Sequence, residues 1–380
     1  MPQRPIPAVF MRGGTSKAIM FHARDLPADR AAWPALFLAA MGSPDPYGRQ
    51  LDGMGGGVSS LSKVCVLAPS AREDADIDYS FFQIQVKEAR VDDRGNCGNM
   101  SSAVGPFAVD EGLVPAAGDT AVVRVYNTNT QKLIHAHFPL DDGRARVGGD
   151  LAIPGVAGTG APVRLDFLSP GGATTGRLLP TGQARERLEV PGLGAIEVSM
   201  VDAANACVFV HAGDLGLTGR ELPDAIEADA PLLARLEAIR RQASVAMGIA
   251  PTLEAAGGIR VVPFIALVSP PAASPMLTGE TLAAEAIDLT ARVMSNGQPH
   301  RALPLTISLC TAVAARIDGT VVAEMARAGA GDLRIGMPSG VLTVAADVVR
   351  EASGAWVARS GAFYRTARRL FDGRVWVPAG

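Results

Sequence analysis

Two stretches of small, apolar residues constrain the fold of this chain most, because each predicts a helix without a polar face. They cover 99–112 and 303–317, and each follows a polar turn that contains glycine. A helix that is apolar all round is typically buried on every side. Short runs with the alternation typical of strands surround both stretches, for example at 79–89. The pattern predicts an α+β fold of two pseudo-symmetric domains, each a curved β-sheet wrapped around a central helix.

The length of the chain predicts two domains. A chain of 380 residues is too long for one ordinary hydrophobic core, and 48% hydrophobic residues are enough to bury two. A glycine- and proline-rich passage at 169–182 is the expected hinge. The sequence therefore predicts an N-terminal domain over 1–185 and a C-terminal domain over 186–359. Whether the C-terminal strand at 360–380 joins the N-terminal domain is left open.

Charge and cysteine content exclude several classes of partner. The formal net charge is −3 and no basic block occurs, so we expect no binding to nucleic acid or to a membrane. The four cysteines are widely separated and form no C-x-x-C pair, so we expect neither a metal site nor a disulfide framework. The chain shows no signal-peptide pattern and no run of roughly 18 apolar residues, which predicts a cytoplasmic protein with reduced thiols.

Cys97 is the strongest candidate for chemistry. It lies between Asn96 and Gly98, where a polar turn leads through Asn99 into the first apolar helix. The start of a helix exposes backbone N–H groups, and its dipole stabilises nearby negative charge. A thiol there is a plausible nucleophile or acid/base, and its small neighbours leave room for a substrate. The alternative is a buried structural cysteine.

The loop at 53–62 is rich in glycine and serine, but it is no nucleotide-binding motif. A phosphate-binding loop would need Gly-Lys-Ser/Thr at 62–64, where the chain has Ser-Lys-Val, and a strand follows in place of a helix. A dinucleotide motif fails for lack of its third glycine. The loop instead suits a carboxylate, which N–H groups and hydroxyls at Gly56, Ser59 and Ser60 can bind.

Lys63 stands where this loop enters an apolar strand. Partial desolvation at that point would favour the neutral amine, which can act as a base near neutral pH. The alternative is an ordinary solvated lysine at the end of a strand, and the sequence leaves both readings open.

The second half offers weaker candidates. Ser339 and Gly340 lie in a tight turn between two strands, which can bind a carboxylate or be only a turn. His300 precedes the second apolar helix and is a candidate for the site or a structural residue. His135 and His137 alternate on one strand without a partner at metal-ligand spacing, so we expect them on the surface.

Taken together, these motifs resemble those of the PrpF family, the 2-methylaconitate cis–trans isomerase group of the diaminopimelate-epimerase-like superfamily. The resemblance covers nearly the whole chain. The stretches that carry it are Met11–Lys17, Met41–Gly48, Leu51–Gly56, Ser62-Lys63, Asn96–Asn99, Gly112–Val114, Leu179–Gly182, Asp202–Asn205 and Pro338–Gly340.

The resemblance implies two similar domains with the active site in the cleft between them. It implies a catalytic pair without a cofactor, which falls on Lys63 and Cys97. The loop that carries Ser16 and Lys17 is a candidate for contact with the substrate. The second domain has Thr306 near its helix start and Cys310 further in, but no cysteine at the start itself, which argues against a two-cysteine racemase.

The activity that the resemblance implies is isomerisation of a small unsaturated di- or tricarboxylate such as 2-methylaconitate or aconitate, as in propionate catabolism through the methylcitrate cycle. One member of the pair removes an allylic proton and the other returns a proton; which is the base stays open. The segments 47–48 and 59–60 look closer to the methylaconitate branch than to the oxalomesaconate branch. Alternatives are 4-oxalomesaconate tautomerase, methylitaconate delta-isomerase, an amino-acid epimerase, and a carboxylate-binding accessory protein of an aconitase-like hydratase. A homodimer is also left open.

Overall fold

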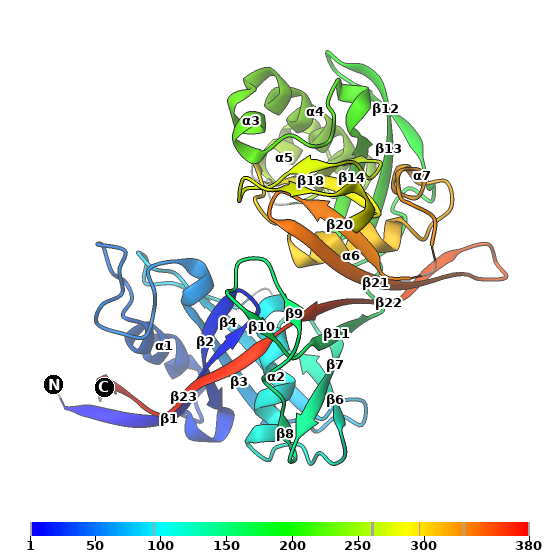
Figure 1. Ribbon diagram of the computed structural model, residues 1–380. Helices are drawn as coiled ribbons and strands as arrows, with labels where there is room; N and C mark the ends of the chain where they lie inside the picture. Colours follow the sequence, from blue (N-terminus) through cyan, green and yellow to red (C-terminus); the bar gives the residue numbers. More distant parts are fainter. Residues whose placement is uncertain (1, 94–95, 260–261, 296, 330, 379–380) are drawn as a thin grey trace. The chain divides into compact units, whose positions relative to one another are not determined.

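The chain folds into two compact units. The computed structural model describes residues 2–93, 96–259, 262–295, 297–329 and 331–378 (Figure 1). Unit 1 comprises Met1–Leu168 and Tyr364–Gly380, and unit 2 comprises Ser169–Phe363. Among the described residues, no helix has the length and apolar character that a membrane crossing requires.

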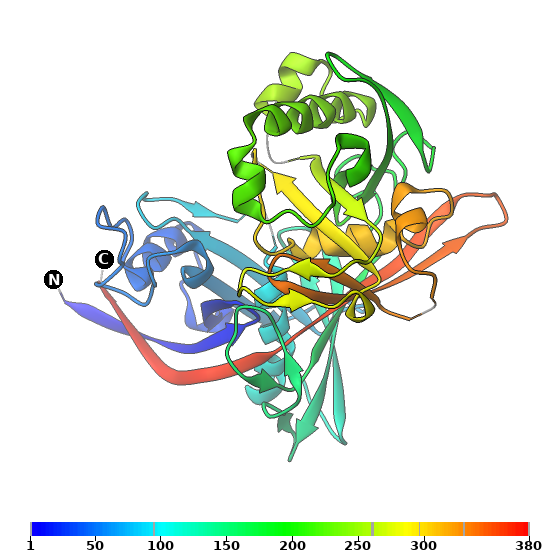
Figure 2. The same ribbon diagram turned by 45° about the horizontal axis from the view of Figure 1, so that its top comes forward.

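Unit 1 is built on one mixed sheet. Its main strands pair in the order β23–β1–β2–β3–β4–β6–β7–β11, and the pairs β2·β3 and β4·β6 are parallel. The ends of the chain meet in this sheet, because β1 and β23 pair along their whole lengths (Figure 2). The strands are β1 (Gln3–Gly13), β2 (Ser16–His22), β3 (Lys63–Pro69), β4 (Ile77–Ile84), β5 (Val91–Asp92), β6 (Thr120–Asn127), β7 (Lys132–Asp141), β8 (Arg144–Ala145), β9 (Leu151–Ala152), β10 (Thr159–Gly160), β11 (Val163–Leu168) and β23 (Ala367–Pro378).

Two helices of unit 1 lie on opposite faces of β2, β3 and β4. Helix α1 (Trp33–Met41) covers the face that carries Ile19, Val64 and Ile84. Helix α2 (Gly98–Asp110) contacts β2 and β3, and every residue from Met100 to Val109 is buried. Because neighbouring residues of a strand point to opposite faces, the α2 side receives the alternate set, which includes Ala18, Met20, Lys63, Cys65, Phe81 and Gln83.

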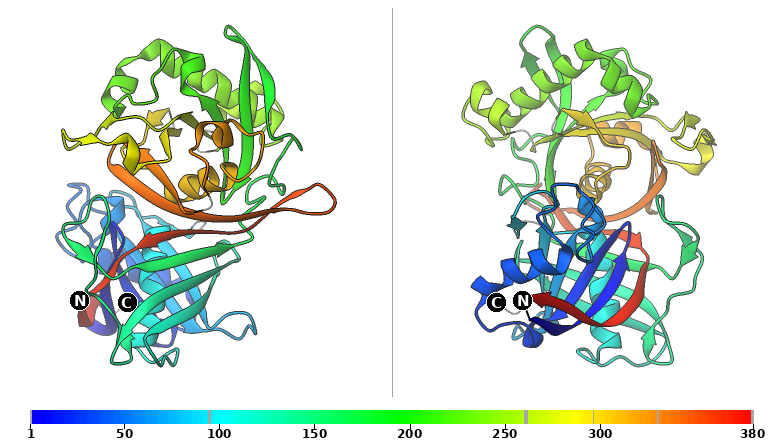
Figure 3. Two further views of the ribbon diagram at one scale, coloured as in Figure 1. Left: turned by 45° about the vertical axis from the view of Figure 1, so that its right-hand side comes forward. Right: turned by 90° about the vertical axis from the view of Figure 1, so that its left-hand side faces the viewer.

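Unit 2 repeats the theme around helix α6 (Leu305–Ala314), which contacts β13, β14 and β21 (Figure 3). Its sheet order is β12–β13–β14–β15–β18–β20–β21–β22, with β14·β15 and β18·β20 parallel. The strands are β12 (Glu186–Val190), β13 (Gly194–Ala203), β14 (Asn205–His211), β15 (Phe264–Ser269), β16 (Ser274–Pro275), β17 (Thr281–Leu282), β18 (Leu289–Ser295), β19 (Gln298–Pro299), β20 (Leu333–Met337), β21 (Gly340–Arg350) and β22 (Trp356–Arg365). The other helices are α3 (Pro223–Ala228), α4 (Ala230–Ala246), α5 (Leu253–Gly258) and α7 (Val321–Met325).

The boundaries differ from those that the sequence predicts. The passage at 169–182 belongs to unit 2: Asp202 of β13 accepts hydrogen bonds at 2.8 and 2.6 Å from the amides of Thr174 and Thr175. Unit 2 therefore begins at Ser169 rather than at 186. The strand expected at 79–89 ends at Ile84, because the Gln85 amide donates to the Arg90 carbonyl and closes a turn.

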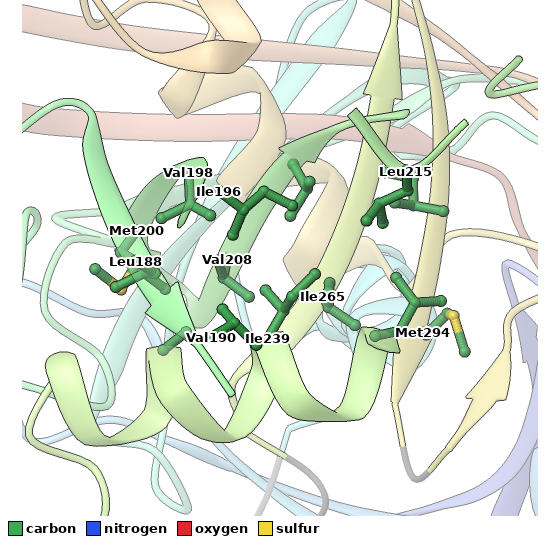
Figure 4. Packing of buried hydrophobic residues seen from close by; sticks show 14 of the residues in the cluster. Leu188, Val190, Ile196, Val198, Met200, Val208, Leu215, Ile239, Ile265 and Met294 are labelled. Atoms are coloured by element: carbon green, nitrogen blue, oxygen red, sulfur yellow. The ribbon is translucent and has the colours of Figure 1, made fainter. Parts of the chain in front are cut away.

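Helix α4 packs against one face of the unit 2 sheet, where it contacts β12 and β15. Its Ile239 packs against Val190, Val208 and Ile265 in a cluster of buried apolar side chains (Figure 4). This cluster removes apolar surface from water on both the helix and the sheet, which stabilises their association.

Replacing Ile239 by Ala is expected to lower the free energy of unfolding by about 2–5 kcal/mol, because it leaves a cavity in this cluster. Leu253→Ala is the matched control in α5, where the side chain is 38% exposed, and should change the free energy by less than about 0.5 kcal/mol. Equilibrium urea unfolding measures both. Equal losses in the two variants would show that this cluster does not stabilise unit 2 as described.

Candidate active site

Cys97 is the N-cap residue of α2. Its backbone is extended, and its carbonyl accepts hydrogen bonds from the Ser101 amide at 2.9 Å and the Ser101 hydroxyl at 3.1 Å. The side chain is half-buried at the N-terminal end of the helix. The predicted helix-start position of Cys97 is confirmed.

The residue before Cys97 is also fixed. Asn96 Oδ1 accepts from the Ser101 hydroxyl at 3.2 Å and from Asn127 Nδ2 at 3.5 Å. Asn127 is fully buried at the end of β6, so its hydrogen bond holds Asn96, the residue before Cys97, to the sheet. Arg94 and Gly95, earlier in the same turn, lie outside the described residues.

Lys63 is the first residue of β3, and only 8% of it is exposed. Its Nζ donates a hydrogen bond to Gln83 Oε1 and lies 5.1 Å from the centre of the Phe81 ring. The reading of Lys63 as a solvated strand-end residue is therefore wrong, because the neighbouring strand β4 covers it.

Cys65 is a buried thiol on the same strand as Lys63. It lies two residues after Lys63 on the same face of β3. Burial raises the pKa of the Cys65 thiol most, negative charge on Cys97 raises it further, and positive charge on Lys63 lowers it. Helix α2, whose N-cap is Cys97, contacts β3, so the strand-borne amine and the helix-start thiol belong to the same side of the unit 1 sheet.

Ser16 and Asn99 join this region through the turn between β1 and β2. Gly14 has φ +51°, and a Cβ there would lie 2.2 Å from Asn99 Oδ1, so only glycine allows this close approach. Asn99 Oδ1 accepts from the Thr15 amide at 3.4 Å and from Arg365 Nε at 3.1 Å. Ser16 follows directly and is buried.

Lys17 does not join this group. It starts the alternate set of β2, on the α1 side of the sheet, and its Nζ lies 5.7 Å from the Phe10 ring. Phe10 belongs to the α1 core. Lys17 and Ser16 therefore point to opposite faces of the sheet, because neighbouring strand residues alternate.

The glycine- and serine-rich loop at 53–62 is held in place by hydrogen bonds to the side chain of Gln50. The side chain of Gln50 accepts hydrogen bonds from the Gly57 amide at 2.9 Å and the Ser62 hydroxyl at 2.6 Å. Ser59 and Ser60 form a short 3-10 helix that leads into β3, and Gly56 packs against Leu61. The loop amides at 54, 55, 57, 61 and 62 all donate within unit 1, and the three residues predicted to bind a carboxylate, Gly56, Ser59 and Ser60, are not among them.

The candidates of the second half belong to unit 2. His300 Nε2 lies 2.8 Å from the Ser295 hydroxyl, and burial lowers the pKa of His300. The hydroxyl of Ser339 is buried, and Gly340 begins β21 with φ +126°. Lys63, Cys97, Ser16 and Asn99 all belong to unit 1.

The start of α6 carries no thiol. Its N-cap is Pro304, and Thr306 accepts a hydrogen bond at 2.9 Å from Asn205 Nδ2. Cys310 is buried inside the helix, and burial raises the pKa of its thiol. Unit 2 therefore lacks the helix-start cysteine of a two-cysteine racemase.

Three polar residues of unit 1 could not be selected from the sequence. Gln83 contacts Lys63, Gln50 holds the loop before it, and the largely buried Arg365 reaches Asn99 at the start of α2. His137 also has a partner that its spacing did not reveal, because its Nε2 lies 2.9 Å from Asp166 on the neighbouring strand. The described residues contain no group of three or more His, Cys, Asp or Glu side chains that could hold a metal.

Comparison with solved structures defines the class of fold first. A methylitaconate delta-isomerase is similar at a TM-score of 0.93 and 42% identity, over 99% of this chain and 96% of that one. A hydroxyproline epimerase from Agrobacterium vitis shares the fold alone, at a TM-score of 0.50 and 13% identity, over 98% of this chain and 93% of that one. The predicted epimerase-like fold is thereby confirmed.

Sequence comparison then gives the family. The model of the PrpF protein family matches residues 3–378, and the chain belongs to this family. The 3-methylitaconate isomerase of Eubacterium barkeri is 43% identical over 99% of this chain and 98% of its own length. The 2-methyl-aconitate isomerase of Shewanella oneidensis is 40% identical over the same shares of the two chains.

Cys97 should be the thiol that brief treatment with iodoacetamide alkylates first. The other three cysteines are buried, and burial raises the pKa of each of their thiols. Peptide mapping by mass spectrometry measures the four rates, and the urea-unfolded chain, in which all four should react alike, is the control. Faster alkylation of any buried cysteine in the folded protein would contradict the site geometry.

Proposed function

We propose that this protein is a cofactor-independent isomerase of small unsaturated di- and tricarboxylates, and that Lys63 and Cys97 transfer the proton. The observation that carries the proposal is that a buried strand-borne amine and a helix-start thiol lie on the same side of the unit 1 sheet, because α2 contacts the strand that Lys63 begins. Both groups can donate and accept a proton without a cofactor.

The chemistry follows from the substrate class. A carboxylate beside a double bond makes the neighbouring allylic C–H acidic, since the electron pair left behind spreads into a dienolate. One residue of the pair removes this proton, and the start of α2 offers its dipole to the developing negative charge. The other residue delivers a proton to the same carbon after bond rotation, or to the far carbon. The first course changes cis to trans, and the second moves the double bond.

Within the class, we place 2-methylaconitate and aconitate first. Support comes from the similarity to the Shewanella 2-methyl-aconitate isomerase and from the segments 47–48 and 59–60. Methylitaconate is the second candidate, because relatives with that activity in their names are 43% and 42% identical to this chain. An amino-acid epimerase is disfavoured by the Pro304 N-cap of α6. A cytoplasmic location is part of the proposal, in keeping with four free cysteines.

Proton NMR of the purified protein with trans-aconitate, 2-methylaconitate, methylitaconate and oxalomesaconate tests the proposal. Lys63→Met should lower kcat by about 10²–10⁴-fold, because it removes one of two positioned acid/base groups. Lys87→Met and Lys132→Met are the matched controls and should retain the wild-type rate, since both lysines lie at strand ends or turns outside the site.

Two results would count against the proposal. If the wild-type protein converts none of the four acids, the substrate class is wrong. If Lys63→Met turns over as fast as the wild type, the assignment of Lys63 is wrong even where isomerisation is observed.

A further inference from the structure

Gln83 lies beside Lys63 in the sheet. The two residues are register partners on the antiparallel strands β4 and β3, and both side chains point to the α2 face. Gln83 also reaches the loop before β3, so it joins three segments around Lys63: its own strand, the strand of Lys63, and the 3-10 helix that begins at Ser59.

The hydrogen bonds of Gln83 fix which end of its amide faces the lysine. Its Nε2 lies 3.0 Å from the Ser59 carbonyl oxygen, 3.0 Å from that of Ser62 and 3.3 Å from that of Ile84. Carbonyl oxygens only accept hydrogen bonds, so the NH₂ group must face them. The amide oxygen is thereby directed at Lys63 Nζ, which donates to it.

We propose that Gln83 is a positioning residue that holds Lys63 as an ammonium, so that Lys63 is the proton donor and Cys97 the base. The inference rests on the proposed isomerase function and adds the direction of proton transfer. A hydrogen bond from a charged donor is about twice as strong as one between neutral groups, so an acceptor fixed in place favours the ammonium. The Phe81 ring, 5.1 Å from Nζ, favours the cation as well.

The other groups that face Lys63 can be named from the strands and the helix around it. Cys65 lies on its own strand, and Tyr79 lies beyond Cys65 on β4. Ala18 is the register partner on β2 and carries no charge. Asp92 of β5 is the register partner of Gln83, and Cys97 lies at the start of α2. The variants below change Gln83 alone.

Three variants of equal side-chain length test the inference. Gln83→Met removes the acceptor, Gln83→Glu replaces it with a charged acceptor, and Gln85→Met changes a glutamine outside β4. In Gln83→Met we expect kcat to fall at least about 10-fold with KM within about twofold. The alkaline limb of the pH–rate profile, where the proton donor is lost, should move to lower pH in Gln83→Met and to higher pH in Gln83→Glu. Gln85→Met should match the wild type.

A second measurement needs no substrate. A pulse of acetic anhydride followed by peptide mapping reports the reactivity of the Lys63 amine, with Lys87 and Lys132 as internal standards. In Gln83→Met, Lys63 should be acetylated faster than in the wild type. In Gln83→Glu, it should be acetylated more slowly than in the wild type. If Gln83→Met fails to fold, the change in the Lys63 acetylation rate in Gln83→Glu tests the role of Gln83 by itself.

The outcomes separate this inference from the proposed function. A wild-type protein that isomerises no acid overturns the function, and the labelling still tests the contact. A wild-type protein that isomerises, with unchanged pH profiles and Lys63 labelling in both Gln83 variants, overturns the role of Gln83. Shifts of both variants in the same direction also overturn it, because only a general disturbance of the fold would produce them.

Discussion

The burial of helix α2 within the sheet of unit 1 is the constraint on which the rest of the site depends. Every residue from Met100 to Val109 is buried, and Gly105 leaves room for Phe138 and Ala136 of β7, where a Cβ would come within 2.7 Å of the Phe138 ring. A helix enclosed in this way has one position, so its first residue has one position too. Cys97 is thereby fixed as the N-cap of a helix that contacts β3, the strand that Lys63 begins.

Side-chain amides hold the polar segments around that meeting point. Gln50 closes the loop before β3, Gln83 links this loop to Lys63, and Asn127 holds the residue before Cys97. An amide both donates and accepts, so it can satisfy a backbone group at one end and orient a functional group at the other. In the proposed mechanism, these residues position the proton-transfer groups and do not themselves react.

The sequence predicted the features that depend on local pattern. The two central helices and the roles suggested for Cys97 and Lys63 follow from apolar runs and from the residues at a turn. Gln83, Gln50 and Arg365 could not be found in this way, because their partners lie 20, 12 and 266 residues away. Lys17 lies on the sheet face opposite that of Ser16 because neighbouring strand residues alternate, and the passage at 169–182 belongs to unit 2, where Asp202 binds it.

The central claim is that Cys97 removes the allylic proton and Lys63 returns one. Exchange of substrate hydrogen with deuterated water, followed by NMR in the Lys63→Met and Cys97→Ser variants, tests it most directly. The account predicts that Lys63→Met still introduces deuterium at the allylic carbon of the substrate but forms isomer at least about 10²-fold more slowly than the wild type, because the thiolate still removes the proton while the positioned proton donor is missing. Cys97→Ser should show neither exchange nor isomer. Exchange in Cys97→Ser together with its loss in Lys63→Met would reverse the two roles and contradict the account.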